Sequence, residues 1–148
     1  MTHTFDADRG FTLNRTFDAP RAKVWRAISE ADLFARWFGA QVDLTVNAWD
    51  LRQGGGWSGV MVYEGTEIPW EGRFVEVDAP SRLAVQITDA PPVKDSDDVL
   101  TYVLTEDGDK TVLEFSQRGG GLTDEQYEQA KAGTEGFLDE LNKVVVTL

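Results

Sequence analysis

The sequence contains no cysteine, and this absence removes a whole set of chemistries. Without thiols the chain forms no disulfide bond, offers no thiolate nucleophile and provides no Cys ligand for a metal. Histidine is almost as scarce, since His3 is the only one and stands beside the N-terminus. A metal site built on histidines and a Ser-His-Asp triad are therefore both excluded.

The familiar motifs of phosphate binding and nucleophilic catalysis are also missing. There is no P-loop, no G-x-S-x-G nucleophile elbow and no G-x-G-x-x-G between a strand and a helix. The glycine triplets at 54–56 and 119–121 lack the Lys, Ser or Thr that a phosphate cradle needs. The acidic residues of 95–98 lack the glycine and the distal glutamate of a calcium loop, so we interpret them as solvated. We expect no metal and no cofactor.

Long apolar runs and basic clusters are absent too. No stretch of eighteen apolar residues occurs and residues 1–10 contain no apolar leader, so we expect a cytoplasmic protein that neither spans a membrane nor carries a secretion signal. The formal net charge is -12, which disfavours nucleic acid and anionic membrane surfaces as partners. We interpret the acidity as a property that keeps the protein in solution.

The residues that are present describe an ordinary globular chain with many rings. Its 148 residues, 41% of them apolar, suit one domain over 1–148, with 1–10 expected to be flexible. Aromatic residues make up 11% of the chain, including five Trp and eight Phe. Such rings either fill a core or line a pocket, and composition does not distinguish the two.

Periodicity predicts the elements of the first part. Apolar and polar residues alternate over Phe11–Phe17, which indicates a strand. Asp18 or its neighbour is placed to cap a following helix, and Pro20 suits the first turn of that helix. Ser29 and the acidic residue three positions later have capping-box spacing, which predicts a second short helix over Asp32–Phe38 that ends at Gly39.

The remaining pattern is that of consecutive strands followed by one long helix. Pro69 and Gly72 interrupt one strand and suggest an edge position or a bulge. Asp107-Gly108 is a strong hairpin signal, and Thr123 opens the last helix with a capping box. Strands are predicted over 42–46, 57–63, 67–77, 83–87, 100–105 and 111–117, with an exposed loop at 89–98.

The order of these elements gives the fold class. Strands that run consecutively instead of alternating with helices predict an α+β domain. We expect a curved antiparallel sheet of about six strands wrapped on the long C-terminal helix, with two short helices after the first strand. A ligand cavity would lie between the sheet and that helix, with a volume of about 300 Å³ or more.

From Phe11 onward the chain resembles the SRPBCC, or START-like, helix-grip superfamily, which includes polyketide cyclases and birch-pollen-allergen-like proteins. Within it, the chain is similar to bacterial relatives of the C-terminal domain of the heat-shock chaperone ATPase activator. The carrying segments are 16–25 (TFDAPRAKVW), 33–39 (LFARWFG), 54–57 (GGGW), 72–77 (GRFVEV), 80–83 (PSRL), 111–115 (TVLEF) and the terminal helix.

The resemblance implies the helix-grip fold and a hydrophobic cavity, but this family includes binders, cyclases, hydrolases and co-chaperone modules. Relatives commonly have Gly-Trp in the final helix, whereas here Gly133 precedes Thr134. We expect this difference to change the cavity or open its mouth, with Phe137 as a compensating ring. A glycine costs about 1 kcal/mol inside a helix. Gly133 and Gly136 therefore indicate either a close approach to the sheet or a kink that gates the cavity.

The candidate ligand-binding residues are large side chains predicted to face the cavity, together with the threonine of the long helix. Each ring also has a plain explanation as core packing. The set comprises Trp37, Phe38, Trp57, Met61, Trp70, Phe74, Tyr102, Phe115, Thr134 and Phe137.

Three functions follow from these observations. The first is a protein that binds a small apolar or aromatic molecule. The second is a cyclase- or hydrolase-like enzyme that uses a cavity carboxylate such as Glu71 or Glu114 with water or Tyr102. For these carboxylates we favour the interpretation as surface cross-strand pairs. The third is a chaperone-associated interaction module, ranked last because the chain lacks the further N-terminal domain expected of a true activator. The oligomeric state is left open.

Overall fold

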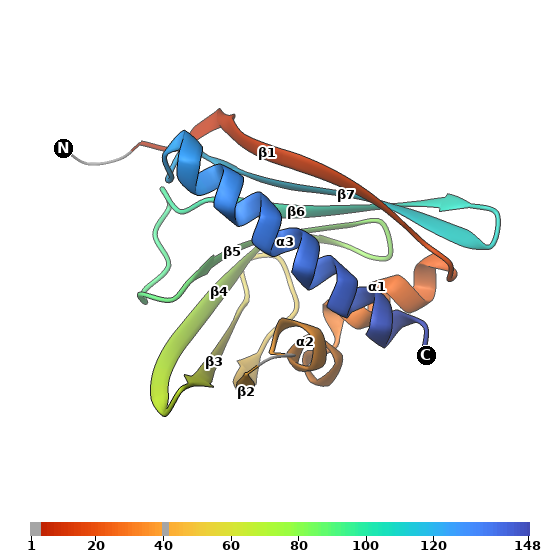
Figure 1. The fold of residues 1–148 in the computed structure, drawn as a ribbon, viewed down its shortest axis with the longest axis horizontal. Coiled ribbons are helices and arrows are strands. Elements are labelled where there is room, and N and C mark those ends of the chain that lie inside the picture. Colours follow the sequence, from red (N-terminus) through yellow and green to blue (C-terminus); the bar gives the residue numbers. More distant parts are fainter. Residues whose placement is uncertain (1–3, 40–41) are drawn as a thin grey trace.

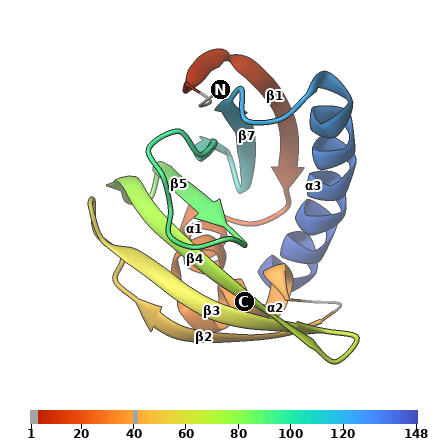
Figure 2. The same ribbon diagram turned by 90° about the vertical axis from the view of Figure 1, so that its left-hand side faces the viewer.

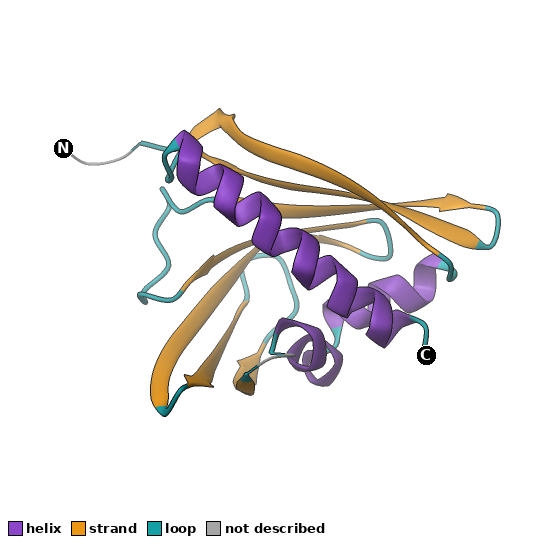
Figure 3. Ribbon diagram, in the orientation of Figure 1, coloured by secondary structure: helices purple, strands orange, loops and turns teal. Residues whose placement is uncertain are grey.

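The computed structural model describes residues 4–39 and 42–148, and in them the predicted α+β class is confirmed (Figures 1 and 3). Two short helices follow the first strand, and a long helix closes the chain. The elements are β1 (Asp6–Phe17), α1 (Arg21–Ser29), α2 (Ala31–Phe38), β2 (Asp43–Trp49), β3 (Gly56–Tyr63), β4 (Thr66–Asp78), β5 (Arg82–Thr88), β6 (Val99–Asp107), β7 (Lys110–Gly119) and α3 (Asp124–Val145).

The strands form one antiparallel sheet in the order β1-β7-β6-β5-β4-β3-β2, which is seven strands where about six were predicted. The sheet is strongly curved, and α3 lies along its concave side (Figure 2). Apart from the β1–β7 pair, every strand pairs with the one before or after it in sequence. The curvature therefore brings β6 and β7 to one side of an interior space, with β4 and α2 on another.

The first strand begins earlier than its alternation suggests. Asp6 pairs with Gly119, and a bulge between Asp6 and Gly10 brings the strand back into register. Gly10 has a φ of +152°, and a Cβ there would collide with the Gln117 carbonyl oxygen. Much of the segment 1–10, expected to be flexible, thus belongs to β1, whereas His3 lies outside the described residues.

The short helices have the predicted positions but different starts. Pro20 and Glu30 occupy the N-cap positions, and neither makes a side-chain capping hydrogen bond. The expected caps at Asp18 and Ser29 are therefore corrected. Asp18 lies two residues before the N-cap of α1. Ser29 is the last residue of α1, because α2 follows directly and the Glu30 N–H still donates to the Arg26 carbonyl at 3.0 Å. Gly39 ends α2 as predicted.

The interruption predicted in β4 lies elsewhere. This strand is interior, and its register shift falls between Phe74 and Glu76. Pairing with β5 starts only at Glu71, so Pro69 stands where no donor is required on that side. Gly72 is needed because a Cβ would collide with the Trp57 indole.

The C-terminal half forms as its motifs predict. The β6–β7 hairpin turns at Gly108, which has a φ of +62°. Thr123 Oγ1 accepts from the Gln126 N–H at 3.2 Å and Gln126 Oε1 accepts from the Thr123 N–H at 2.9 Å, which completes the capping box.

Among the described residues, no helix has the length and apolarity that crossing a membrane requires.

Candidate ligand-binding site

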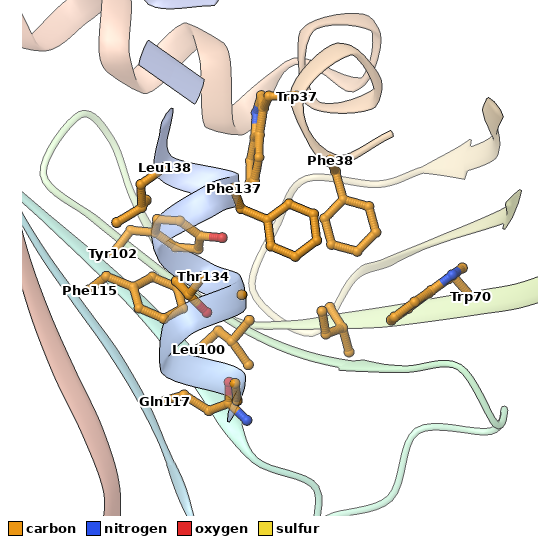
Figure 4. A pocket seen from close by; sticks show the side chains of 13 residues that line it. Trp37, Phe38, Trp70, Leu100, Tyr102, Phe115, Gln117, Thr134, Phe137 and Leu138 are labelled. Carbon is orange, nitrogen blue, oxygen red and sulfur yellow. The ribbon is translucent and has the colours of Figure 1, made fainter. Parts of the chain in front are cut away.

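A cavity of about 230 Å³ lies between α3 and the concave side of the sheet (Figure 4). Thirteen side chains from α2, β4, β5, β6, β7 and α3 surround it, and none of them carries a charge. They are Trp37, Phe38, Trp70, Ile87, Leu100, Tyr102, Phe115, Gln117, Ala130, Gly133, Thr134, Phe137 and Leu138. We call this space the inner cavity.

The wall formed by the sheet comes from two cross-strand pairs of β6 and β7. Tyr102 is opposite Phe115, and Leu100 is opposite Gln117. Side chains two positions apart along a strand share a face, so all four point toward α3. The rings of Tyr102 and Phe115 meet edge to face, with centroids 5.1 Å apart, and both side chains are buried.

The opposite wall is an aromatic cluster. The rings of Phe38 and Phe137 are stacked, with centroids 5.3 Å apart and planes within 7° of each other. Trp70 meets Phe38 edge to face at 5.2 Å. Figure 4 shows the stacked pair opposite Tyr102. Phe137 remains 40% exposed, so its outer side reaches solvent.

A second cavity of about 380 Å³ adjoins the first, and we call it the outer cavity. Both are lined by Trp37, Phe38, Gly133 and Phe137, so they meet at the stacked rings. Ligand sites commonly have volumes of about 300–1,000 Å³. The inner cavity is therefore smaller than expected, and the outer cavity lies within the range.

The two glycines of α3 face empty space. A Cβ built at Gly133 or at Gly136 finds no atom within 4 Å. The prediction that these glycines allow a close approach of helix to sheet is therefore wrong. The alternative was a kink, and α3 runs as one helix through both positions. Gly133 lines both cavities and Gly136 lines the outer one, so their missing side chains enlarge these spaces.

Polar groups in the lining are few. The Tyr102 hydroxyl makes no hydrogen bond with any residue that the structure describes, and burial raises its pKa above the ordinary tyrosine value. Thr134 presents a hydroxyl from α3 (Figure 4). The Trp70 indole N–H is buried and also without a partner in the described part of the chain.

Gln117 connects the cavity to the loop before β6. Its Nε2 donates to Asp98 Oδ2 at 3.0 Å, and the Tyr127 hydroxyl donates to the same oxygen at 2.9 Å. The Gly121 N–H donates to Asp98 Oδ1 at 3.0 Å. Asp98, interpreted from sequence as a solvated loop residue, thus joins β7 and α3 at one end of the cavity.

Seven of the ten predicted ligand-binding residues surround the inner cavity, and Met61 lines the outer one. Trp57 and Phe74 line neither. The Trp57 ring packs under Phe34 of α2, with centroids 5.1 Å apart, and Phe74 packs on Trp49 at 5.3 Å. Both fill the core because α2, rather than α3, covers that part of the sheet. Ligand binding by the other eight residues stays a prediction.

Sequence reasoning missed part of the lining: Ile87, Leu100, Ala130 and Leu138. Strand alternation with Tyr102 could have found Leu100, and helical spacing from Phe137 could have found Ala130. Gln117 and Gly133 had been noted for other reasons. The pairing of the strands determines which side chains face one another across the cavity, and the sequence does not reveal that pairing.

The carboxylates considered for catalysis lie away from the inner cavity. Glu114 is exposed, and Glu71 accepts a hydrogen bond from the Val93 N–H at 3.1 Å. Neither lines the cavity. In residues 4–39 and 42–148, no group of three His, Asp or Glu side chains is placed to hold a metal ion.

Solved structures share this fold. A protein from Chromobacterium violaceum has 21% identity over 93% of this chain and 97% of its own, with a TM-score of 0.77. One from Staphylococcus epidermidis has 23% identity, covers 97% and 94%, and has a TM-score of 0.79. An AHSA1-like protein from Aeromonas hydrophila has 22% identity, covers 93% of each chain and has a TM-score of 0.72.

A search of the curated proteins finds no relative of the chain. One family model matches residues 18–146, which is most of the length. The cavity lining, strands β2 to β7 and the long helix lie within the matched region, whereas β1 precedes it. The chain therefore belongs to the family described as activator of Hsp90 ATPase homolog 1-like protein.

Proposed function

We propose that this protein binds a small apolar or aromatic molecule in the inner cavity. The observation that carries the proposal is a space of about 230 Å³ surrounded by thirteen uncharged, mostly apolar side chains. An empty apolar space forfeits dispersion contacts along its whole lining. A ligand of matching shape regains them and removes its own apolar surface from water.

The lining favours binding over catalysis. An enzyme that uses a cavity carboxylate needs an acidic group beside the ligand, and Glu71 and Glu114 are both outside the lining. The apolar character of the walls supports recognition by shape and burial. A few polar groups would then fix the orientation of the ligand.

Fluorescence titration with N-phenyl-1-naphthylamine, an uncharged aromatic probe, tests the proposal. We expect its emission to rise and to saturate at one probe per protein. Gly133→Leu places a side chain where both cavities meet, so it should weaken binding at least tenfold. Gly136→Leu is the matched control, because it has the same open surroundings and lines only the outer cavity.

Two results would contradict this assignment. Probe emission that rises without saturation would indicate nonspecific surface binding. Equal loss in the two leucine variants would place the probe in the outer cavity instead. Circular dichroism of both variants checks that α3 still forms, which we expect because leucine favours helix over glycine.

A chaperone contact is the second candidate, and the family description is the observation that favours it. An interaction module needs an exposed docking patch. Among the described residues, adjacent exposed apolar side chains occur at Val62 and Tyr63, near the β3–β4 turn. Addition of the protein to Hsp90 with a measurement of ATP hydrolysis tests this candidate, and an unchanged rate would reject it.

A further inference from the structure

The inner cavity favours a ligand without charge. No Lys, Arg, Asp or Glu side chain is among its thirteen lining residues. An ion moved into such surroundings loses its hydration without gaining a partner, which costs several kcal/mol. Uncharged molecules do not incur this cost.

Several polar groups of the lining make no hydrogen bond within the described part of the protein, and the Tyr102 hydroxyl is one of them. The Tyr102 side chain is only 6% exposed, and its hydroxyl has no hydrogen-bond partner among the residues that the structure describes. Figure 4 shows the hydroxyl oxygen directed from β6 toward the space beside Phe137. The hydroxyl oxygen is not among the fully buried atoms without a partner in the described residues, which are Arg21 Nε and Trp70 Nε1, so it keeps accessible surface at which a ligand can bond to it.

The other polar atoms of the lining have different situations. Thr134 lies in a helix, where a threonine hydroxyl can turn to the carbonyl four residues earlier. Gln117 already donates to Asp98. In Figure 4 the Trp70 nitrogen lies at the end of the indole away from Tyr102. Tyr102 is therefore the group best placed to meet a ligand at the centre of the cavity.

The phenol chemistry of Tyr102 indicates which half of the hydrogen bond the ligand supplies. Burial raises the pKa of this hydroxyl, so it keeps its proton at neutral pH. A protonated phenol can donate or accept, and it is the better donor because its oxygen lone pair is delocalised into the ring, so we assign the acceptor to the ligand. Carbonyl oxygens, ether oxygens and uncharged ring nitrogens meet this requirement.

Resting on the function proposed above, we infer that the ligand is an uncharged aromatic molecule with one hydrogen-bond acceptor, which the Tyr102 hydroxyl binds. A cavity of about 150 Å³ accepts a benzene molecule. The inner cavity of about 230 Å³ therefore has room for more than one ring, such as two fused rings with a substituent. The ring system lies between Phe115 and the stacked Phe38 and Phe137, with its acceptor toward β6.

The test compares two fused-ring compounds of nearly equal shape, 1-tetralone and tetralin, of which only the first has a carbonyl. Their affinities are measured by displacement of N-phenyl-1-naphthylamine from the wild-type protein and from Tyr102→Phe. We expect the preference for 1-tetralone over tetralin to fall about three- to tenfold in the variant, the value of one hydrogen bond. Tyr127→Phe is the control, because its hydroxyl is bonded to Asp98 outside the lining.

The possible results distinguish the role of Tyr102 from the proposed binding function. If Tyr102→Phe keeps the wild-type preference while both compounds bind, the role of Tyr102 is overturned and the binding function stands. Binding of 1-naphthoate, a charged analogue, as tightly as 1-tetralone overturns the uncharged class. If the probe binds the wild-type protein and neither neutral compound displaces it, the ligand class inferred here is overturned; if the probe itself does not bind, the proposed function fails as well.

Discussion

At the scale of single residues, two buried tyrosines have opposite surroundings. The Tyr127 hydroxyl donates to Asp98, whereas the Tyr102 hydroxyl has no partner among the described residues. Burial raises the pKa of both hydroxyls, and for Tyr127 the neighbouring carboxylate raises it further. Removal of the Tyr127 hydroxyl should therefore lower the stability of the fold, whereas removal of the Tyr102 hydroxyl should not.

Alkaline pH reveals this difference. Unfolded tyrosines ionise near pH 10, while a folded tyrosine with a raised pKa stays protonated. Above pH 10 the unfolded state binds fewer protons, so stability falls as pH rises, by at most about 1.4 kcal/mol per pH unit and tyrosine. We expect Tyr102→Phe to lose less unfolding free energy than wild type between about pH 8 and pH 11.

Urea unfolding at several pH values measures this effect. Tyr127→Phe should show the same shallower loss, together with lower stability at neutral pH, by about 1–3 kcal/mol, because its hydrogen bond to Asp98 is gone. Tyr102→Phe should be no less stable than wild type at neutral pH. A steep alkaline loss in Tyr102→Phe would contradict a protonated Tyr102.

At the scale of elements, α3 is fixed at its ends and borders both cavities in its middle. Arg9 forms an ion pair with Asp124 at 2.9 Å, and Tyr127 bonds to Asp98. At the other end, Leu141 and Val145 are fully buried. Between these anchors the helix passes beside both cavities.

Hydrogen exchange should therefore detect a ligand in the central turns of this helix. An amide exchanges through local opening, and a ligand that packs beside residues 130–138 makes that opening rarer. We expect N-phenyl-1-naphthylamine to slow exchange at 130–138 more than at the β3–β4 turn, as followed by mass spectrometry. Slowing only at the β3–β4 turn would place the probe on another surface.

The sequence predicts such elements better than it predicts the site. Alternation, the hairpin glycine and the capping box at Thr123 are local signals, so the class and the order of elements follow from them. Trp57 and Trp70 differ in role although both are strand tryptophans, because α2 covers the first and leaves the second beside the cavity. That distinction depends on contacts between distant segments, which no local pattern contains.

At the scale of the whole molecule, a net charge of -12 surrounds a cavity without charged walls. The acidic surface acts on charged ligands through solvent, where salt screens it. The acidic surface should therefore have little effect on the affinity for an uncharged ligand. The interior and the exterior are thus expected to respond differently to ionic strength.

A salt titration tests this separation. The affinity for 1-tetralone should change less than about twofold between about 20 mM and 500 mM sodium chloride, because neither ligand nor lining is charged. Binding of 1-naphthoate, if measurable, should strengthen with salt as repulsion by the acidic surface is screened. A marked loss of 1-tetralone affinity at high salt would point to a charged contact absent from the described lining.

The open space beside Gly133 and Gly136 has a consequence for diversity among proteins of this shape. A substitution at either position changes the volume offered to a ligand without displacing a packed atom, and most side chains favour the helix more than glycine does. New ligand sizes are therefore reachable by single mutations that do not weaken the scaffold. Selectivity in such a protein can change from one lineage to the next while the sheet stays the same.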